Sequence, residues 1–334
     1  MTRREAVLAG AQSASRLHDR LHVRQQVEAS AGSIDVFGAI LALGTPLIFR
    51  PLEGLLGACL PGPGIVISTE RPLAIQRFTG AHELGHVALG HDASLDGEEI
   101  LSRVRQNGER GTISEIEVAA DSFASAFLLP KWLLQMHARR QGWNRASVAD
   151  PHVVYQLSLR VGASYSATCV ALKRHDIIDA ATCEALQSKP RRTIKAELLD
   201  GVEVDNYFRD VWLLTERDEG STIEGQPDDI LILRLTEQGG AGYLWTTLGL
   251  AESGFAILRD RREVPPPSAG IGGPATRAVV ARRIEPAKGS LALELRRPWL
   301  TTEKPLATLR VAYDLRGKEV GMPRATRRQL RLAA

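Results

Sequence analysis

His82, Glu83 and His86 have the residue types and the spacing that metal chemistry requires. They form an H-E-x-x-H in a segment that we predict to be helical, where residues four apart lie on the same face. Two imidazoles in that arrangement can hold one zinc ion, and Glu83 can take a proton from a metal-bound water. The spacing therefore predicts part of a hydrolytic metal site.

The element that must position these side chains is a helix starting after Thr69, with Pro72 near its first turn, and stopping at Gly90. A Gly/Pro turn and a β-branched strand at 61–69 precede it. An H-E-x-x-H can arise by chance in a long chain. The strand before the helix, together with small and apolar neighbours such as Gly80 and Gly85, favours a metal site over coincidence.

A catalytic zinc ion needs a third protein ligand and an open fourth position. The segment 112–130 predicts a second helix, and Glu117 and Asp121 lie one turn apart at the edge of its apolar stripe. Uncompensated carboxylates are costly in that position. A metal would compensate Glu117, whereas Asp121 could orient a ligand histidine from outside the ligand set.

A different interpretation of Glu117 is that Ser114-x-x-Glu117 forms a capping box at the start of this helix. Thr112-x-x-Glu115 is a second capping box, and its use would let Glu117 face inward. We therefore favour Glu117 over Glu115 as the third ligand, on the grounds of helical face.

The chain has three cysteines, an odd number spread far apart, which fits a reducing compartment better than a disulfide framework. Cys169 and Cys183 lie in apolar helical contexts typical of inert core thiols. Cys59 is expected in the turn before the strand that borders the metal site. Because zinc binds thiolate well, Cys59 could fill the fourth position and act as an inhibitory ligand.

Composition limits the class of protein. The 334 residues are 44% apolar, enough for two or three domains, and the net charge of +3 argues for no dedicated nucleic-acid or membrane partner. No apolar run approaches the roughly 20 residues of a membrane span, and the N-terminus lacks the apolar core of a secretory signal. We therefore expect a cytoplasmic protein.

The expected fold class is α+β: a mainly helical zincin-like domain with a small sheet, followed by an all-β immunoglobulin-like sandwich. Residues 2–30 have the periodicity of one amphipathic helix, whereas short strands separated by Gly/Pro turns predominate after about residue 200. The expected divisions are a metallopeptidase domain at 1–188 with a helical subdomain at 131–188, a basic linker at 189–200, the sandwich at 201–320 and a basic tail at 321–334.

Residues 33–130 resemble the ImmA/IrrE family of bacterial metallopeptidases. RFTGAHELGHVALGH and EVAADSFASAFLLP match the two family segments, and GIVIST resembles the strand before the first. The resemblance implies one zinc ion held by His82, His86 and Glu117, with Glu83 as general base and Asp121 behind a ligand. The family often has a further glutamate where this chain has Ala119. No oxyanion-stabilising residue is identifiable, and His91 is one candidate.

The C-terminal part resembles chagasin-like domains, immunoglobulin-like inhibitors of cysteine peptidases. The similar stretches are GGAGYLW at 239–245, GIGG at 270–273 and RRPW at 296–299. Residues 238–241 are Gln-Gly-Gly-Ala where the inhibitors carry Asn-Pro-Thr-Thr, which argues against peptidase inhibition. Trp245 and Trp299 are expected in the core.

The expected function is a regulatory zinc metalloendopeptidase that cleaves a helix-turn-helix repressor in response to stress, DNA damage or phage. The resembled family and the similar CapP-type peptidases of anti-phage operons imply this substrate and an activating signal such as single-stranded DNA. Two alternatives stay open. One is a non-catalytic binding or inhibitor protein that uses the chagasin-like domain, and the other is a transcriptional regulator that binds DNA through 145–195.

Overall fold

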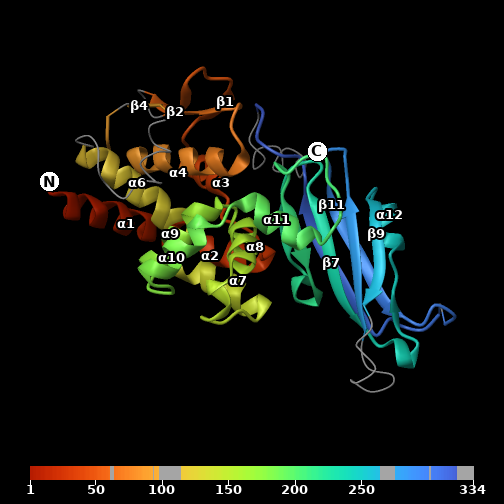
Figure 1. Ribbon diagram of the computed structural model, residues 1–334. Coiled ribbons are helices and arrows are strands. Elements are labelled where there is room, and N and C mark those ends of the chain that lie inside the picture. Colours follow the sequence, from red (N-terminus) through yellow and green to blue (C-terminus); the bar gives the residue numbers. More distant parts are fainter. Residues whose placement is uncertain (61–63, 93, 98–113, 264–274, 301, 322–334) are drawn as a thin grey trace.

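The computed structural model describes residues 1–60, 64–92, 94–97, 114–263, 275–300 and 302–321 (Figure 1). A mainly helical part with a small sheet lies beside a β-sandwich, which agrees with the expected fold class. Within the described residues, no helix combines the length and the apolar character needed to cross a membrane.

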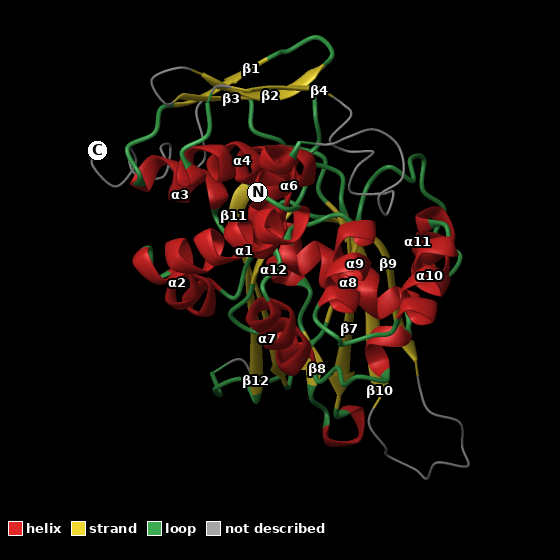
Figure 2. Ribbon diagram, turned by 90° about the vertical axis from the view of Figure 1, so that its left-hand side faces the viewer, coloured by secondary structure: helices red, strands yellow, loops and turns green. Residues whose placement is uncertain are grey.

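The small sheet covers the helix that carries the H-E-x-x-H sequence. Its strands are β1 (Leu47–Arg50), β2 (Leu55–Leu60), β3 (Gly64–Ser68) and β4 (Ser94–Gly97), in the order β1-β3-β2-β4. Figure 2 shows this sheet as a layer on the far side of α4 (Leu73–Leu89) from the rest of the helical part. Cys59, expected in a turn, belongs to β2 and pairs with Ile65 of β3.

The helix α4 ends at Gly90 as expected, with φ +69°, but Pro72 rather than Thr69 is its N-cap. It packs on α6 (Glu115–Leu128). At the crossing, a Cβ on Gly85 would lie 3.1 Å from the Phe123 Cβ and 3.2 Å from the Ala120 Cα. The glycine therefore lets the two helices that carry the candidate ligands approach closely.

The N-terminal segment departs from the expected single helix. It forms α1 (Arg3–Arg20) and α2 (Val23–Ser30), because the chain turns through His22 in a left-handed conformation with φ 51°. The turn brings Val23 and Val27 of α2 into the same core as Leu17 of α1. The next helix is α3 (Val36–Ala42).

The helical subdomain continues further than expected. Its helices are α7 (Lys131–Gln141), α8 (Pro151–Val161), α9 (Tyr165–Arg174), α10 (Ala180–Ser188) and α11 (Arg191–Leu199). The expected basic linker at 189–200 is thus wrong, since most of it is α11. Ile194 and Leu199 of that helix are buried in the helical core, which is why the segment packs rather than links.

The C-terminal part is the expected sandwich of two four-stranded sheets. The first, in the order β5-β7-β10-β9, consists of β5 (Val211–Leu214), β7 (Ile230–Glu237), β10 (Ala275–Arg282) and β9 (Ala256–Glu263). The second, in the order β6-β12-β11-β8, consists of β6 (Thr222–Glu224), β12 (Ala307–Asp314), β11 (Lys288–Arg296) and β8 (Leu244–Trp245). A short helix, α12 (Leu248–Glu252), precedes β9.

Of the two tryptophans expected in the core, one is buried and the other is exposed. Trp245 is 2% exposed and belongs to the sandwich core, whereas Trp299 is 67% exposed. The expectation for Trp299 is wrong because this residue follows β11 in the turn at 297–300, where its ring lies over Gly242. GIGG at 270–273 lies outside the described residues.

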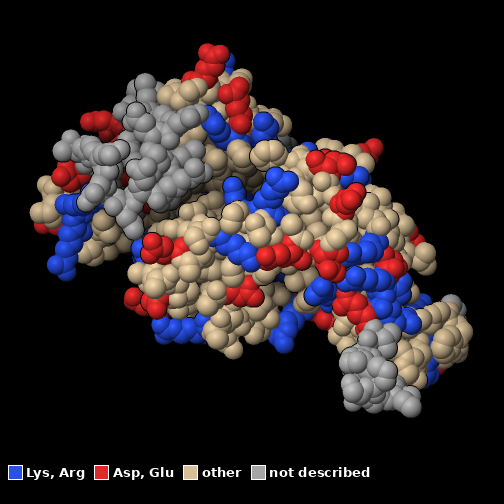
Figure 3. Space-filling view, in the orientation of Figure 1, with Lys and Arg blue, Asp and Glu red and all other residues tan. Residues whose placement is uncertain are grey.

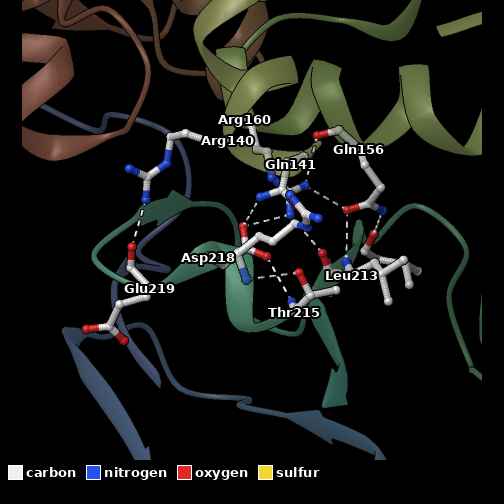
Figure 4. Close-up of polar contacts among 10 residues, drawn as sticks. Arg140, Gln141, Gln156, Arg160, Leu213, Thr215, Asp218 and Glu219 are labelled. Carbon is white, nitrogen blue, oxygen red and sulfur yellow. Dashed lines mark hydrogen bonds and ion pairs between the residues drawn. The ribbon is translucent and has the colours of Figure 1, made fainter. Parts of the chain in front are cut away.

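In the sheet β5-β7-β10-β9, the strands β5, β7 and β10 contribute buried residues on both faces. Trp212, Leu233 and Val279 on one face belong to the sandwich core, whereas Ile232 and Val280 on the other belong to the core of the helical part. Polar contacts reinforce this second interface (Figure 4).

In that polar cluster, Arg160 donates to the Asp218 carboxylate at 2.9 Å, and the Gln141 amide donates to the same oxygen at 2.7 Å. The sandwich therefore joins the helical part through polar contacts as well as through apolar residues buried in the helical core.

His137 of α7 gives the helical core a pH dependence. The imidazole is 3% exposed and its Nε2 lies 3.1 Å from the Gly32 carbonyl oxygen, and burial lowers its pKa to about 4. The unfolded chain has an ordinary value of about 6.5. Between these values the unfolded state binds the proton more readily, so stability falls as the pH is lowered.

We therefore expect His137 alone to remove about 2 kcal/mol of unfolding free energy between pH 7 and pH 5. Urea unfolding at both pH values measures it, and His137→Asn, which keeps a side-chain donor, should lose this part of the pH dependence. An unchanged pH dependence in the variant would contradict the assignment.

Candidate metal centre

The structure brings His82 and His86 of α4 together with Glu117 of α6. The two Nε2 atoms lie 3.0 Å apart, and Glu117 oxygens lie 3.3 Å from the His82 Nε2 and 3.6 Å from the His86 Nε2. Both imidazoles are fully buried, whereas the Glu117 side chain is 19% exposed. Among the described residues, these three form the group of histidine, cysteine and acidic side chains spaced for a shared metal ion.

These distances fit zinc. Ligand atoms at about 2.0–2.2 Å from one tetrahedral zinc ion lie about 3.3 Å from one another. The three separations of 3.0, 3.3 and 3.6 Å bracket that value, and two nitrogens with one carboxylate are a donor set typical of catalytic zinc sites. His82, His86 and Glu117 can therefore hold the ion and leave a fourth position for reactants.

Two further side chains orient the imidazoles. An oxygen of Asp121 lies 2.9 Å from the His82 Nδ1, and the His91 Nδ1 lies 3.1 Å from the His86 Nδ1. Because each contact involves Nδ1, the Nε2 atom of each ring stays directed at the position that a metal ion would occupy between the three candidate ligands. Burial lowers the pKa of His91, partly offset by the Glu117 carboxylate, and a neutral His91 can accept the His86 Nδ1–H. His91 thus lies against a candidate ligand rather than in a position expected for an oxyanion donor.

The start of α6 explains how Glu117 can satisfy two roles. Ser114 is the N-cap, and its hydroxyl accepts the backbone N–H of Glu117 at 3.3 Å. The carboxylate of the same residue turns toward the histidines. Only the N-cap half of the expected Ser114-x-x-Glu117 capping box forms, and it uses the backbone N–H of Glu117, so the carboxylate can serve as a metal ligand. Glu115 is exposed at the start of the helix, and Thr112 lies outside the described residues.

Glu83 is fully buried on the face of α4 that β2 covers. A Cβ on Gly57 of β2 would lie 3.1 Å from the Glu83 Oε1, 2.4 Å from the Thr79 Cγ2 and 3.0 Å from the Val66 carbonyl oxygen. Gly57 is thus required where the strand passes over the carboxylate. Sequence analysis did not identify this residue, because neither β2 nor its contact with α4 has a local signal.

Gly57→Ala is expected to lower the unfolding free energy by about 1–3 kcal/mol, since the added methyl overpacks this contact. It should also displace the Glu83 carboxylate and lower hydrolysis more than it lowers zinc affinity. Chemical unfolding and metal titration measure the two effects. Gly64→Ala in the neighbouring strand is the control, because its nearest contact would be an ordinary 3.8 Å. Equal effects of both substitutions would contradict this account.

Cys59 lies outside the three-residue metal group of the described chain. It is buried in β2, two residues beyond Gly57, so its side chain lies on the α4 side of the strand. Zinc ligation by this thiol stays a prediction.

A stretch of the helical part is similar to a known peptidase family. Residues 43–173 match the peptidase family Peptidase_M78, described as the IrrE N-terminal-like domain. The matched range contains both α4 and α6 and extends into the helical subdomain. No match was found among curated proteins.

Solved structures match the C-terminal part. The cysteine protease inhibitor EhICP2 from Entamoeba histolytica is 22% identical, and 100% of its chain aligns with 33% of this chain at a TM-score of 0.30. Amebosin is 18% identical, with 98% of its chain aligned to 32% of this one and a TM-score of 0.25. PbICP-C, solved in complex with falcipain-2, is 17% identical, with 98% of its chain aligned to 34% of this one and a TM-score of 0.20.

Proposed function

We propose that the protein is a zinc-dependent endopeptidase that cleaves a helix-turn-helix repressor, because residues 43–173 match the IrrE N-terminal-like domain of Peptidase_M78. The observation that carries this proposal is the convergence of His82, His86 and Glu117 beside the buried Glu83. The family resemblance stated for the motifs supplies the substrate class. A single regulatory substrate, rather than general digestion, is the activity that we propose.

The roles of the side chains follow from their positions. Zinc, when bound by His82, His86 and Glu117, would supply Lewis-acid polarisation of the scissile carbonyl. Asp121 holds the His82 ring and His91 the His86 ring, so that both Nε2 atoms stay directed at the ion. Glu83 takes a proton from the attacking water and delivers it to the leaving amine, as general base and then general acid.

Co-expression tests the proposal. The protein is expressed with each small helix-turn-helix protein encoded beside its gene, with and without DNA damage, and the products are analysed by mass spectrometry. A fragment that forms with the unaltered protein and vanishes with Glu83→Gln supports repressor cleavage, and its ends give the cleaved bond. The damage-dependent arm tests whether single-stranded DNA or another damage signal is the activator. If no encoded repressor is cut in either arm, the proposed substrate class is wrong.

Two of the basic side chains in the segment 145–195, the candidate for DNA binding, are engaged within the protein. Lys195 is buried, and its ammonium lies 2.9 Å from an Asp210 oxygen, whereas Lys189 pairs with Glu197 at 2.7 Å. Over the sandwich, basic side chains lie among acidic ones on the face shown in Figure 3. Side chains that are paired in this way are poorly placed to contact phosphates.

A further inference from the structure

Gln76 of α4 is bound to the C-terminal end of the sandwich. Its side chain is fully buried, and the amide donates to the Glu319 carbonyl oxygen at 2.9 Å while accepting the Glu319 N–H at 2.8 Å. The same amide donates to the Ser68 carbonyl oxygen at the end of β3, at 3.0 Å. Gln76 thus pairs with Glu319 as a neighbouring strand would, and joins the small sheet, α4 and the segment that follows β12.

Arg77, the next residue, makes a second attachment to the sandwich. Its guanidinium lies 2.5 Å from an oxygen of Glu224 in β6, and Ser33 donates to the same oxygen at 2.7 Å. The Arg77 and Glu224 side chains are 8% and 16% exposed, so solvent screens this ion pair little. Gly162 at the end of α8 leaves room for the guanidinium, since a Cβ there would lie 2.2 Å from its Nη1.

The attachments lie on the helix that carries the catalytic side chains. Residues seven apart on an α-helix share a face, so Gln76 and Glu83 both face the small sheet, about 10 Å apart along the axis. A tilt of α4 at its N-terminal end would move Glu83 relative to β2 and to the three metal-binding side chains. The sandwich is therefore joined to α4 where it can set the position of the general base.

We infer that Gln76 and Arg77 are positioning residues through which the sandwich holds α4 in its hydrolytic orientation. The expected effect of these residues on the rate of hydrolysis rests on the proposed peptidase function. Their expected effect on the stability of α4 does not. It assigns to the sandwich a role in the peptidase reaction besides any partner it binds. Neither residue contacts the metal-binding atoms, and both act through the position of α4.

The test compares two glutamines that each donate a hydrogen bond to the sandwich. Gln76→Met, on α4, removes the hydrogen bonds to Glu319 together with the one to Ser68. Gln141→Met, at the end of α7, removes the donor to Asp218 of the sandwich (Figure 4). We expect Gln76→Met to lower kcat for the repressor found by co-expression about 10- to 100-fold, with KM and zinc affinity little changed. Gln141→Met should lower Tm but leave kcat unchanged. Of these two variants, Gln76→Met should accelerate hydrogen exchange over 73–89 and Gln141→Met should not.

Arg77→Met is the second variant, because Gln76→Met could fail to fold. It should act in the same direction as Gln76→Met, and Arg77→Lys, which keeps the charge beside Glu224, should recover part of the rate.

The inference is overturned if Gln76→Met and Arg77→Met both retain the kcat and the hydrogen exchange over 73–89 of the unaltered protein. It is also overturned if Gln141→Met changes kcat and this exchange as much as Gln76→Met does. If the unaltered protein cleaves no repressor, the proposed function fails, and the exchange over 73–89 still decides whether the sandwich holds α4.

Discussion

Replacing Glu83 by Gln is expected to lower the rate of peptide-bond hydrolysis by about 100- to 10,000-fold, the usual contribution of a general base. The amide has nearly the size of the carboxylate, so the packing beneath β2 should stay intact, but the amide cannot accept the proton of the attacking water. Zinc affinity should stay close to that of the unaltered protein, because Glu83 is not one of the three grouped ligands. Single-turnover cleavage of the repressor and zinc titration measure these two quantities.

Glu115→Gln is the matched control for this loss of rate. Glu115 is exposed in the first turn of α6, and the same chemical change there should leave hydrolysis unaltered. A Glu83→Gln protein that retains more than about a tenth of the rate would remove Glu83 from the reaction. The base would then have to be sought among the other residues near the metal group.

The second large effect concerns zinc affinity. Replacing Glu117 by Ala should weaken zinc binding by more than about 100-fold, because loss of an orienting residue alone commonly costs 10- to 100-fold. The helix start should survive, since Ser114 accepts the backbone N–H of residue 117. Competition with a chromophoric chelator measures the affinity directly and requires no substrate.

Two further substitutions calibrate this result. Asp121→Asn should weaken zinc binding by about 10- to 100-fold, because its contact holds the His82 ring rather than the ion. Glu115→Ala should leave the affinity unchanged. If Glu115→Ala weakens zinc binding as strongly as Glu117→Ala, the third ligand is misassigned.

The local part of the site was predictable from the sequence. A helix that ends at glycine places His82 and His86 on one face, and a cap followed by an apolar stripe places Glu117 at the edge of α6. These signals work because they depend on residues within a few turns of one another. The alternating strands of the sandwich core were predictable for the same reason.

The long-range part was not predictable. Gln76 and Glu319 are 243 residues apart, and nothing near either residue indicates the other. The strand β9, whose sequence is largely charged, lacks the alternation of an ordinary half-buried strand, because some of its arginines face the helical part and pair there. The turn at His22 contains neither glycine nor proline, so the sequence has no residue there that predicts a break between α1 and α2.

Because β5, β7 and β10 contribute to both hydrophobic cores, the stability of the peptidase part is coupled to that of the sandwich. Ile232 and Val280 would be exposed to water if either part unfolded alone. Because exposing apolar surface costs free energy, the two parts are expected to unfold together in one cooperative transition. A molecule that binds only the folded sandwich then also protects the peptidase against heat and proteolysis, by mass action. The abundance of the active enzyme in a cell would in this way depend on the occupancy of a surface far from its histidines.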